Sequence, residues 1–176
     1  LTLLSMVGYA GFYTLFLKHT TSQNIVIGGA AGATPPLLGW VAITNSFDPK
    51  SLLLVLIIFV WTPPHFWSLA VYRSKDYFQA KIPMLPVTHG VQFTKLYVLL
   101  YTLLLFAVSL LPYVVWLSGL IYLFSACVLG FIFIGYATYF YLTKNNDFAI
   151  KVFRYSITYL MLLFTMMLLD HYLKIG

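Results

Sequence analysis

The sequence has little charge and a single cysteine. Only 8% of its 176 residues are charged and 61% are hydrophobic, whereas about a quarter of an ordinary soluble domain is charged. Cys127 allows no intramolecular disulfide and no cysteine-rich metal site. Together with a mean hydropathy of +0.91, this composition predicts an all-α integral membrane protein, because helices satisfy their own backbone hydrogen bonds in lipid.

Long apolar runs divide the chain into six predicted transmembrane helices, since roughly 20 residues cross a bilayer as a helix. We expect them at residues 1–17, 25–43, 51–72, 96–115, 119–142 and 153–172. The first run starts at Leu1 without an initiator methionine, and it lacks the basic leading region of a signal peptide. We therefore expect a single transmembrane domain over 1–176 that is incomplete at its N-terminus.

Basic residues concentrate on one predicted side of the membrane. Lys50 and Lys174 lie on one side, and the other side carries Lys18, Arg73, Lys75, Lys81, Lys95, Lys144, Lys151 and Arg154. Because short cytoplasmic loops are rich in Lys and Arg, the pattern predicts a cytoplasmic 73–95 loop and a C-terminus on the opposite side. Topology thus accounts for the net charge of +6, and we expect no nucleic-acid partner.

The segment 61–86 places polar groups where an apolar span meets water. Its span, WTPPHFWSLAVY, continues directly into the loop RSKDYFQAKIPMLP. Ionisable groups beside hydrocarbon cost free energy and therefore indicate function. Asp76 could hold Mg²⁺ while Arg73 and Lys75 bind phosphate oxygens, as diphosphate chemistry requires. The alternative is a surface ion pair of little energetic value.

Prolines, glycines and one histidine mark the interior of the second and third predicted spans. Pro35–Pro36 and Pro63–Pro64 are predicted to break the helical hydrogen-bond ladder. Gly28 and Gly32 form a small-residue face, which favours close helix packing. His65 lies about 10 Å from the loop end of its span at 1.5 Å per residue. It is either a hydrogen-bonded packing residue or a group that transfers a proton or contacts a haem.

Three motifs carry a family resemblance. They are YTLFLKHTTSQNIVIGGAAGATPPLLGW at Tyr13–Trp40, WTPPHFW at Trp61–Trp67 and DYFQAKIPMLP at Asp76–Pro86. In this order and spacing they resemble the protoheme IX farnesyltransferases, or haem O synthases, of the intramembrane aromatic prenyltransferase superfamily. The likeness extends over essentially the whole chain. It implies that the chain corresponds to the last six helices of a nine-helix bundle in the bacterial inner membrane, with an active site that opens to the cytoplasm.

The resemblance also implies a reaction and a set of site residues. The family transfers a farnesyl group from farnesyl diphosphate to a vinyl group of haem b, and two acidic motifs hold Mg²⁺ and diphosphate. The second motif corresponds to Asp76, with Ala80 where broader relatives carry another aspartate, and the first would lie upstream of this chain. We therefore expect this part alone to be inactive. The resemblance gives catalytic roles to Asp76 and Lys18, and substrate-binding roles to Tyr13, Asn24, His65, Arg73, Lys75 and Tyr77.

Two other classes share some of these features. A multi-pass transporter also has helices broken by Gly and Pro, but it would place binding groups near the bilayer midplane, whereas the charged candidates here gather at one surface. A haem-carrying electron-transfer subunit would offer paired axial ligands. His65 has no such partner, because His19 and His89 lie in predicted loops and His171 lies at the far end of the last predicted span. An acidic motif in the upstream sequence would favour the enzyme over both.

Overall fold

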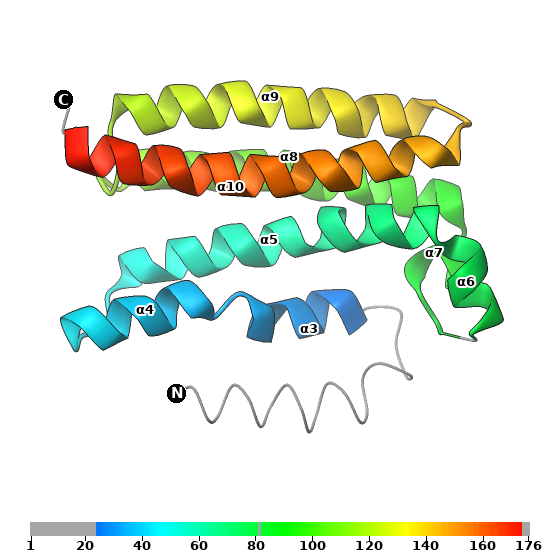
Figure 1. The fold of residues 1–176 in the computed structure, drawn as a ribbon, viewed down its shortest axis with the longest axis horizontal. Coiled ribbons are helices and arrows are strands. Elements are labelled where there is room, and N and C mark those ends of the chain that lie inside the picture. The colour runs from blue at the N-terminus through cyan, green and yellow to red at the C-terminus, as the bar shows by residue number, and fades with distance from the viewer. Residues whose placement is uncertain (1–23, 81, 174–176) are drawn as a thin grey trace.

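The computed structural model describes residues 24–80 and 82–173, and the regular structure in these ranges is helical (Figure 1). The first predicted span, Tyr13, Lys18, Lys81 and Lys174 lie outside the described residues. Four segments are long and apolar enough to cross a membrane: α5 (Pro49–Tyr72), α8 (Val91–Val114), α9 (Leu120–Leu142), and a 3-10 turn, η2 (Asn146–Phe148), followed by α10 (Ala149–Leu173). The shorter helices are α3 (Asn24–Gly32), α4 (Pro35–Thr44), α6 (Ser74–Gln79) and α7 (Leu85–Thr88).

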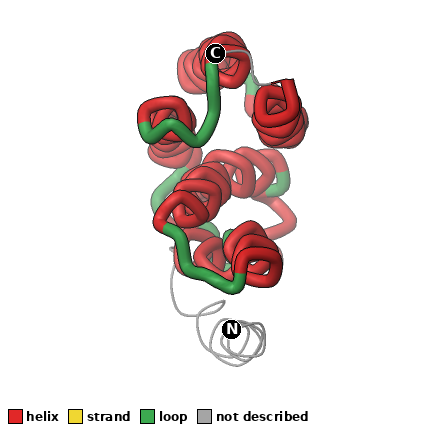
Figure 2. The backbone as a smooth tube through the Cα atoms, turned by 90° about the vertical axis from the view of Figure 1, so that its left-hand side faces the viewer, coloured by secondary structure: helices red, strands yellow, loops and turns green. Residues whose placement is uncertain are grey.

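The four long helices form an antiparallel bundle. α5 packs against α8, α8 against α9, α9 against α10, and α10 returns to α5, while α3 and α4 pack on α5. Figure 1 shows the helices side by side, and Figure 2 shows them end on. The C-terminus of α5, the N-terminus of α8 and the α9–α10 connection all lie at one end, together with α6 and α7. This end is called the α6 end below.

Large aromatic and aliphatic side chains fill the space between the long helices. Trp67, Tyr122, Phe133 and Tyr159 are among those with almost no exposed surface. Gly130 of α9 is buried against the ring of Phe106 in α8, and a Cβ added there would overlap that ring. The absence of a side chain at this position therefore sets how closely α8 and α9 approach.

The second predicted span is two helices rather than one. α3 ends at Gly32, α4 begins at Pro35, and the Thr34 hydroxyl donates to the Ala31 carbonyl at 2.8 Å between them. The predicted break at Pro35–Pro36 is thus confirmed. A proline fits the first turn of a helix, where its missing N–H has no intrahelical acceptor, but not the interior. The described residues therefore show four helices of spanning length, and six are not confirmed.

Pro63 and Pro64 remove donors from the hydrogen-bond ladder as predicted, but the third predicted span does not break into two helices. α5 runs without interruption from Pro49 to Tyr72, and both prolines are buried. The missing N–H groups leave the carbonyls four residues earlier without their helical donors. Packing of this segment among neighbouring helices nevertheless keeps the chain helical.

Lys95 was assigned to the loop after the third span, and this assignment was also wrong. α8 begins at Val91, so Lys95 lies in its second turn with 2% of its surface exposed. Gly90, with φ of +85°, precedes the helix in a conformation that favours glycine. The Lys95 ammonium donates to the Thr143 carbonyl at 2.8 Å and lies 4.9 Å from the centre of the Phe140 ring. The supposed loop is instead two short helices and brief connections.

Candidate functional site

The α6 end of the bundle holds most of the described basic residues. Of these, Lys50 lies at the opposite end of α5, and the α6 end carries Arg73, Lys75, Lys95, Lys144, Lys151 and Arg154. α3 also begins at this end, with Asn24 as its first residue. The fold therefore brings the backbone of Asn24 toward the end of the bundle that carries Arg73 and Asp76.

α6 has two faces with different neighbours. Successive residues of a helix are rotated by about 100°, so Arg73, Asp76 and Tyr77 share one face. Ser74, Lys75, Phe78 and Gln79 occupy the other face, and all four line a pocket. The candidate residues of this segment are therefore divided by helix register: Asp76 and Tyr77, with Arg73 at the N-cap, fall outside the pocket lining, whereas Lys75 is part of it.

Asp76 lies in the first turn of α6, and its side chain is exposed. Its N–H donates to the Arg73 carbonyl at 3.1 Å, and its carbonyl accepts from the Ala80 N–H at 3.0 Å. A carboxylate is favourable near the positive end of a helix dipole. In the described ranges, no three His, Cys, Asp or Glu side chains lie close enough together to hold a metal ion. Asp76 can therefore supply one metal ligand, and the other ligands must come from other groups.

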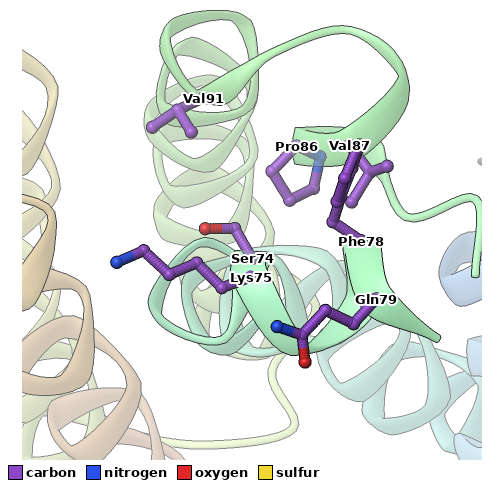
Figure 3. Close-up of a pocket in the computed structure, with 7 residues that line it drawn as sticks. All are labelled: Ser74, Lys75, Phe78, Gln79, Pro86, Val87 and Val91. Atoms are coloured by element: carbon purple, nitrogen blue, oxygen red, sulfur yellow. The ribbon is translucent and has the colours of Figure 1, made fainter. Parts of the chain in front are cut away.

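The pocket on the other face of α6 lies between α6, α7 and the start of α8 (Figure 3). Its volume is about 380 Å³. The polar part of its wall is Ser74, Lys75 and Gln79, and the apolar part is Phe78, Pro86, Val87 and Val91. We call it the α6–α8 pocket.

Two apolar grooves lie beside the middle of α5. The larger, of about 590 Å³, lies between α4, α5 and α10 and is lined by Pro35, Pro36, Ile58, Trp61, Ile157, Leu160, Met161 and Phe164. The smaller, of about 190 Å³, lies between α3 and α5 and is lined by Ile25, Gly28, Gly29, Gly32, Ile58, Trp61, Thr62 and Phe66. Ile58 and Trp61 line both, so the grooves are adjacent at the α3–α4 break, and they offer an apolar surface able to receive a hydrocarbon or a flat aromatic ligand.

The predicted small-residue face of the second span contributes to the smaller groove. Gly28, Gly29 and Gly32 line it. A Cβ at Gly29 would come within 2.9 Å of the Thr62 Cγ2 atom, so this glycine permits the close approach of α3 to α5. At Gly32 no atom lies within 4 Å of the same added carbon. The glycines therefore both bring the two helices together and leave open space beside them.

His65 is held on three sides by its neighbours. Its ring stacks on Trp61 with centroids 4.2 Å apart and on Phe153 at 4.5 Å, and 8% of the residue is exposed. Its Nδ1 atom lies 2.7 Å from the Ser156 hydroxyl. Seven residues of continuous helix separate His65 from Tyr72, which confirms a depth of about 10 Å from the end of α5.

The contacts of Ser156 decide which nitrogen of His65 carries the proton. The Ser156 hydroxyl donates its one hydrogen to the Phe153 carbonyl at 2.6 Å. It can then only accept from His65, which must donate from Nδ1–H. In the neutral ring this leaves Nε2 as an acceptor.

Trp61 is the residue that the motif analysis did not select. It lines both apolar grooves, stacks on His65 and donates from Nε1 to the Ser156 carbonyl at 2.8 Å. His65 is absent from the lining of both grooves, so Trp61 stands between the histidine and the apolar surface. The signal was the spacing of Trp61 and His65, which at i and i+4 share one helix face.

Comparison with known proteins adds a family match. The model of the UbiA prenyltransferase family matches residues 1–167. The chain is 63% identical over 172 residues to a protoheme IX farnesyltransferase of Legionella pneumophila, with 98% of this chain and 58% of that protein covered. It is 60% identical over 175 residues to protoheme IX farnesyltransferase 1 of Pseudomonas aeruginosa and 58% identical to the Hahella chejuensis protein, in both cases over 99% of this chain and 58% of the relative.

The chain thus spans a little over half the length of these relatives. No solved structure matches it. The family match covers α3 to α9 and most of α10, and it therefore includes both faces of α6 and both apolar grooves.

Proposed function

The chain belongs to the UbiA prenyltransferase family, and from this premise we propose that the full-length protein transfers a farnesyl group from farnesyl diphosphate to a vinyl group of haem b. Water adds to the vinyl group in the same reaction, diphosphate leaves, and the product is haem O. The relatives named above are protoheme IX farnesyltransferases and are 58–63% identical to this chain over nearly all of its length. The observation that carries the proposal is the single face formed by Arg73, Asp76 and Tyr77 at the α6 end, beyond apolar grooves that run along α5.

The charged part of the site binds the diphosphate. Arg73 donates to phosphate oxygens, and the Tyr77 hydroxyl on the same face supplies a further hydrogen bond. Lys18 and Asn24, predicted for the same role, complete this part of the site. These groups stabilise the negative charge that develops on the diphosphate as its bond to the allylic carbon breaks.

The donor set at Asp76 fits Mg²⁺. This ion is usually held by one or two carboxylates together with substrate phosphates and water, and Asp76 offers one exposed carboxylate beside the proposed diphosphate groups. Mg²⁺ bound there would neutralise charge on the leaving group. Asp76 thus both supplies a metal ligand and fixes the position of the diphosphate relative to the bundle.

The apolar part of the site receives the hydrocarbon and the porphyrin. Phe66 of the smaller groove lies six residues before the end of α5, or about 9 Å along the helix. The faces of Trp61 and Phe66 stabilise an allylic cation, and the apolar lining excludes water until the carbon–carbon bond has formed. We propose that His65 acts on the haem side of this surface, where it holds Trp61 in place.

We further propose that the protein lies in a bacterial inner membrane with the α6 end facing the cytoplasm and the C-terminus on the other side. The support is the concentration of basic residues at the α6 end and the four helices of spanning length. Charged residues gathered at one surface, with apolar grooves behind them, favour a prenyltransferase over a transporter with a binding site at mid-depth.

The test is the formation of haem O by the full-length protein in membranes supplied with haem b and farnesyl diphosphate. Extracted pigments are separated by chromatography. We expect Asp76→Asn to abolish haem O while the amount of inserted protein is unchanged, because the substitution keeps the size of the side chain and removes its charge. Asp147→Asn is the matched control, since Asp147 is an exposed carboxylate in η2 at the same end. Near-normal product from the Asp76 variant would remove this residue from the site, and no haem O from the unmodified protein would reject the function.

A further inference from the structure

The α6–α8 pocket is separate from the proposed diphosphate face. Lys75 lines the pocket, whereas Asp76 and Arg73 do not. The lining contains one cation, the Ser74 hydroxyl and the Gln79 amide, and it contains no carboxylate. A ligand held by these groups therefore carries negative charge and needs no metal.

The pocket suits a single phosphodiester better than a diphosphate. One ammonium group balances one negative charge, and the hydroxyl and the amide can donate to the remaining phosphate oxygens. A diphosphate carries more charge than one lysine neutralises. The volume of about 380 Å³ lies at the small end of ligand pockets, which fits a headgroup rather than a porphyrin with its side chains.

The rest of the lining indicates the depth at which the ligand lies. Phe78, Pro86, Val87 and Val91 make most of the wall apolar. Exposed aromatic side chains occur at this level, among them Tyr72 at the end of α5 (47%), Phe78 on α6 (72%) and Phe93 at the start of α8 (38%). Exposed aromatic rings near the ends of spanning helices mark the interface between hydrocarbon and headgroups.

We propose that the α6–α8 pocket binds the phosphodiester headgroup of an anionic phospholipid. The phosphate lies against Lys75, Ser74 and Gln79, and the glycerol and upper acyl chains contact the apolar wall. Basic pockets between helices on the positively charged side of a membrane protein recognise such headgroups. Because the lipid occupies one face of α6 and the diphosphate the other, a bound lipid also fixes α6 between them.

Site-specific photocrosslinking tests the proposal. The full-length protein, carrying benzoylphenylalanine at position 79, is reconstituted in vesicles with equal amounts of phosphatidylglycerol and phosphatidylcholine, and the crosslinked lipid is identified by mass spectrometry. We expect about five-fold enrichment of phosphatidylglycerol, which corresponds to about 1 kcal/mol per lysine near the surface. A probe at position 80 is the control, because Ala80 lies on the face of Asp76. There we expect the two lipids in proportion to their abundance.

Charge variants identify the group that selects the lipid. Lys75→Gln is expected to remove the enrichment and Lys75→Arg to keep it. Lys144→Gln, which makes the same change in net charge at another exposed position of the α6 end, is expected to leave it intact. Lys75 is itself exposed, so its replacement does not disturb the buried core.

Three results would overturn the proposal. Equal capture of the two lipids at position 79 would show that the pocket does not select charge. Displacement of phosphatidylglycerol by excess inorganic phosphate would assign the pocket to a soluble anion. Capture of farnesyl diphosphate or haem b at position 79 would show that the pocket binds a substrate of the proposed reaction. The readout does not depend on turnover, so its failure is distinguishable from failure of the proposed function.

Discussion

Lys95 and Asp170, the two charged side chains that are buried in the described ranges, bind opposite ends of the same helix. At the N-terminus of α9, the Asp170 carboxylate accepts from the N–H groups of Gly119 and, at 3.2 Å, of Tyr122. At the C-terminus, the Lys95 ammonium donates to the Thr143 carbonyl. Each charge thus satisfies backbone groups that have no partner within the helix, and each has the sign that the helix dipole favours.

We predict that each of these charges stabilises the bundle independently of the other. Asp170→Asn and Lys95→Met should each lower the free energy of unfolding by about 1–3 kcal/mol, since each leaves buried polar groups unpaired. The 23 residues of α9 separate the sites by about 34 Å, so the double variant should show the sum within about 0.5 kcal/mol. Thermal or denaturant unfolding of the full-length protein in detergent measures the three values. A double variant that loses much less than the sum would mean that one end of α9 depends on the other.

The glycines of α9 provide a second prediction with an internal control. Gly130→Ala should destabilise the protein by about 1–3 kcal/mol, because its methyl group would overlap the Phe106 ring and force α8 from α9. Gly135→Ala, on the same helix, meets no atom within 4 Å and should be neutral or stabilising by up to about 1 kcal/mol. Unfolding of the two variants under identical conditions makes the comparison. Equal effects at both positions would indicate helix propensity rather than packing.

A third prediction separates the nitrogen atoms of His65 from its ring. His65→Phe keeps an aromatic ring between Trp61 and Phe153 but removes the donor to Ser156. Because His65 is proposed to act on the haem side of the apolar surface, we expect the KM for haem b to rise about ten-fold, the value of one hydrogen bond of about 1.4 kcal/mol. The KM for farnesyl diphosphate should change by less than about two-fold, a difference below about 0.4 kcal/mol. Equal changes in both constants would make His65 a packing residue.

Arg73 is predicted to bind farnesyl diphosphate. Arg73→Gln should raise the KM for farnesyl diphosphate at least ten-fold, since a hydrogen bond to a charged group contributes about 1.5–3 kcal/mol, and should leave the KM for haem b near its original value. Lys144→Gln removes the same charge from the same end of the bundle and serves as the control. If the two variants behave alike, the effect is one of net charge and not of a specific contact. Lys18→Ala tests whether Lys18 of the first predicted span also binds farnesyl diphosphate, and the KM for farnesyl diphosphate is again the measurement.

The orientation of the bundle can be measured by cysteine labelling. In a full-length protein without Cys127, a cysteine at Gln79 marks the α6 end and one at Ser46 marks the opposite end, and both positions are exposed. The excess of basic residues at the α6 end predicts that an impermeant thiol reagent added outside labels position 46 and not position 79. The reverse pattern would place the proposed site in the wrong compartment.

Much of the helical framework was predictable because its causes are local. The runs that became α5, α9 and α10 were located within a few residues, since apolar length and internal hydrogen bonding depend on each segment alone. The break before Pro35 was predictable for the same reason, because the ring removes a donor from its own helix. Lys95 was misplaced because the start of α8 depends on Gly90 and on an acceptor that lies far away in the sequence.

The amino-acid sequence alone was sufficient to predict that apolar helices form, where basic residues concentrate, and which motifs resemble a prenyltransferase. The packing of the helices was needed to show that α5 stays continuous through Pro63–Pro64, that Lys75 but not Asp76 lines the α6–α8 pocket, and that Trp61 rather than His65 lines the grooves. It also assigned both buried charges, whose partners lie 48 and 51 residues away in the chain. A local sequence pattern predicts the hydrogen bonds that a segment forms within itself. A buried charge is stable only where another segment places an unpaired group beside it, and that depends on how the helices pack.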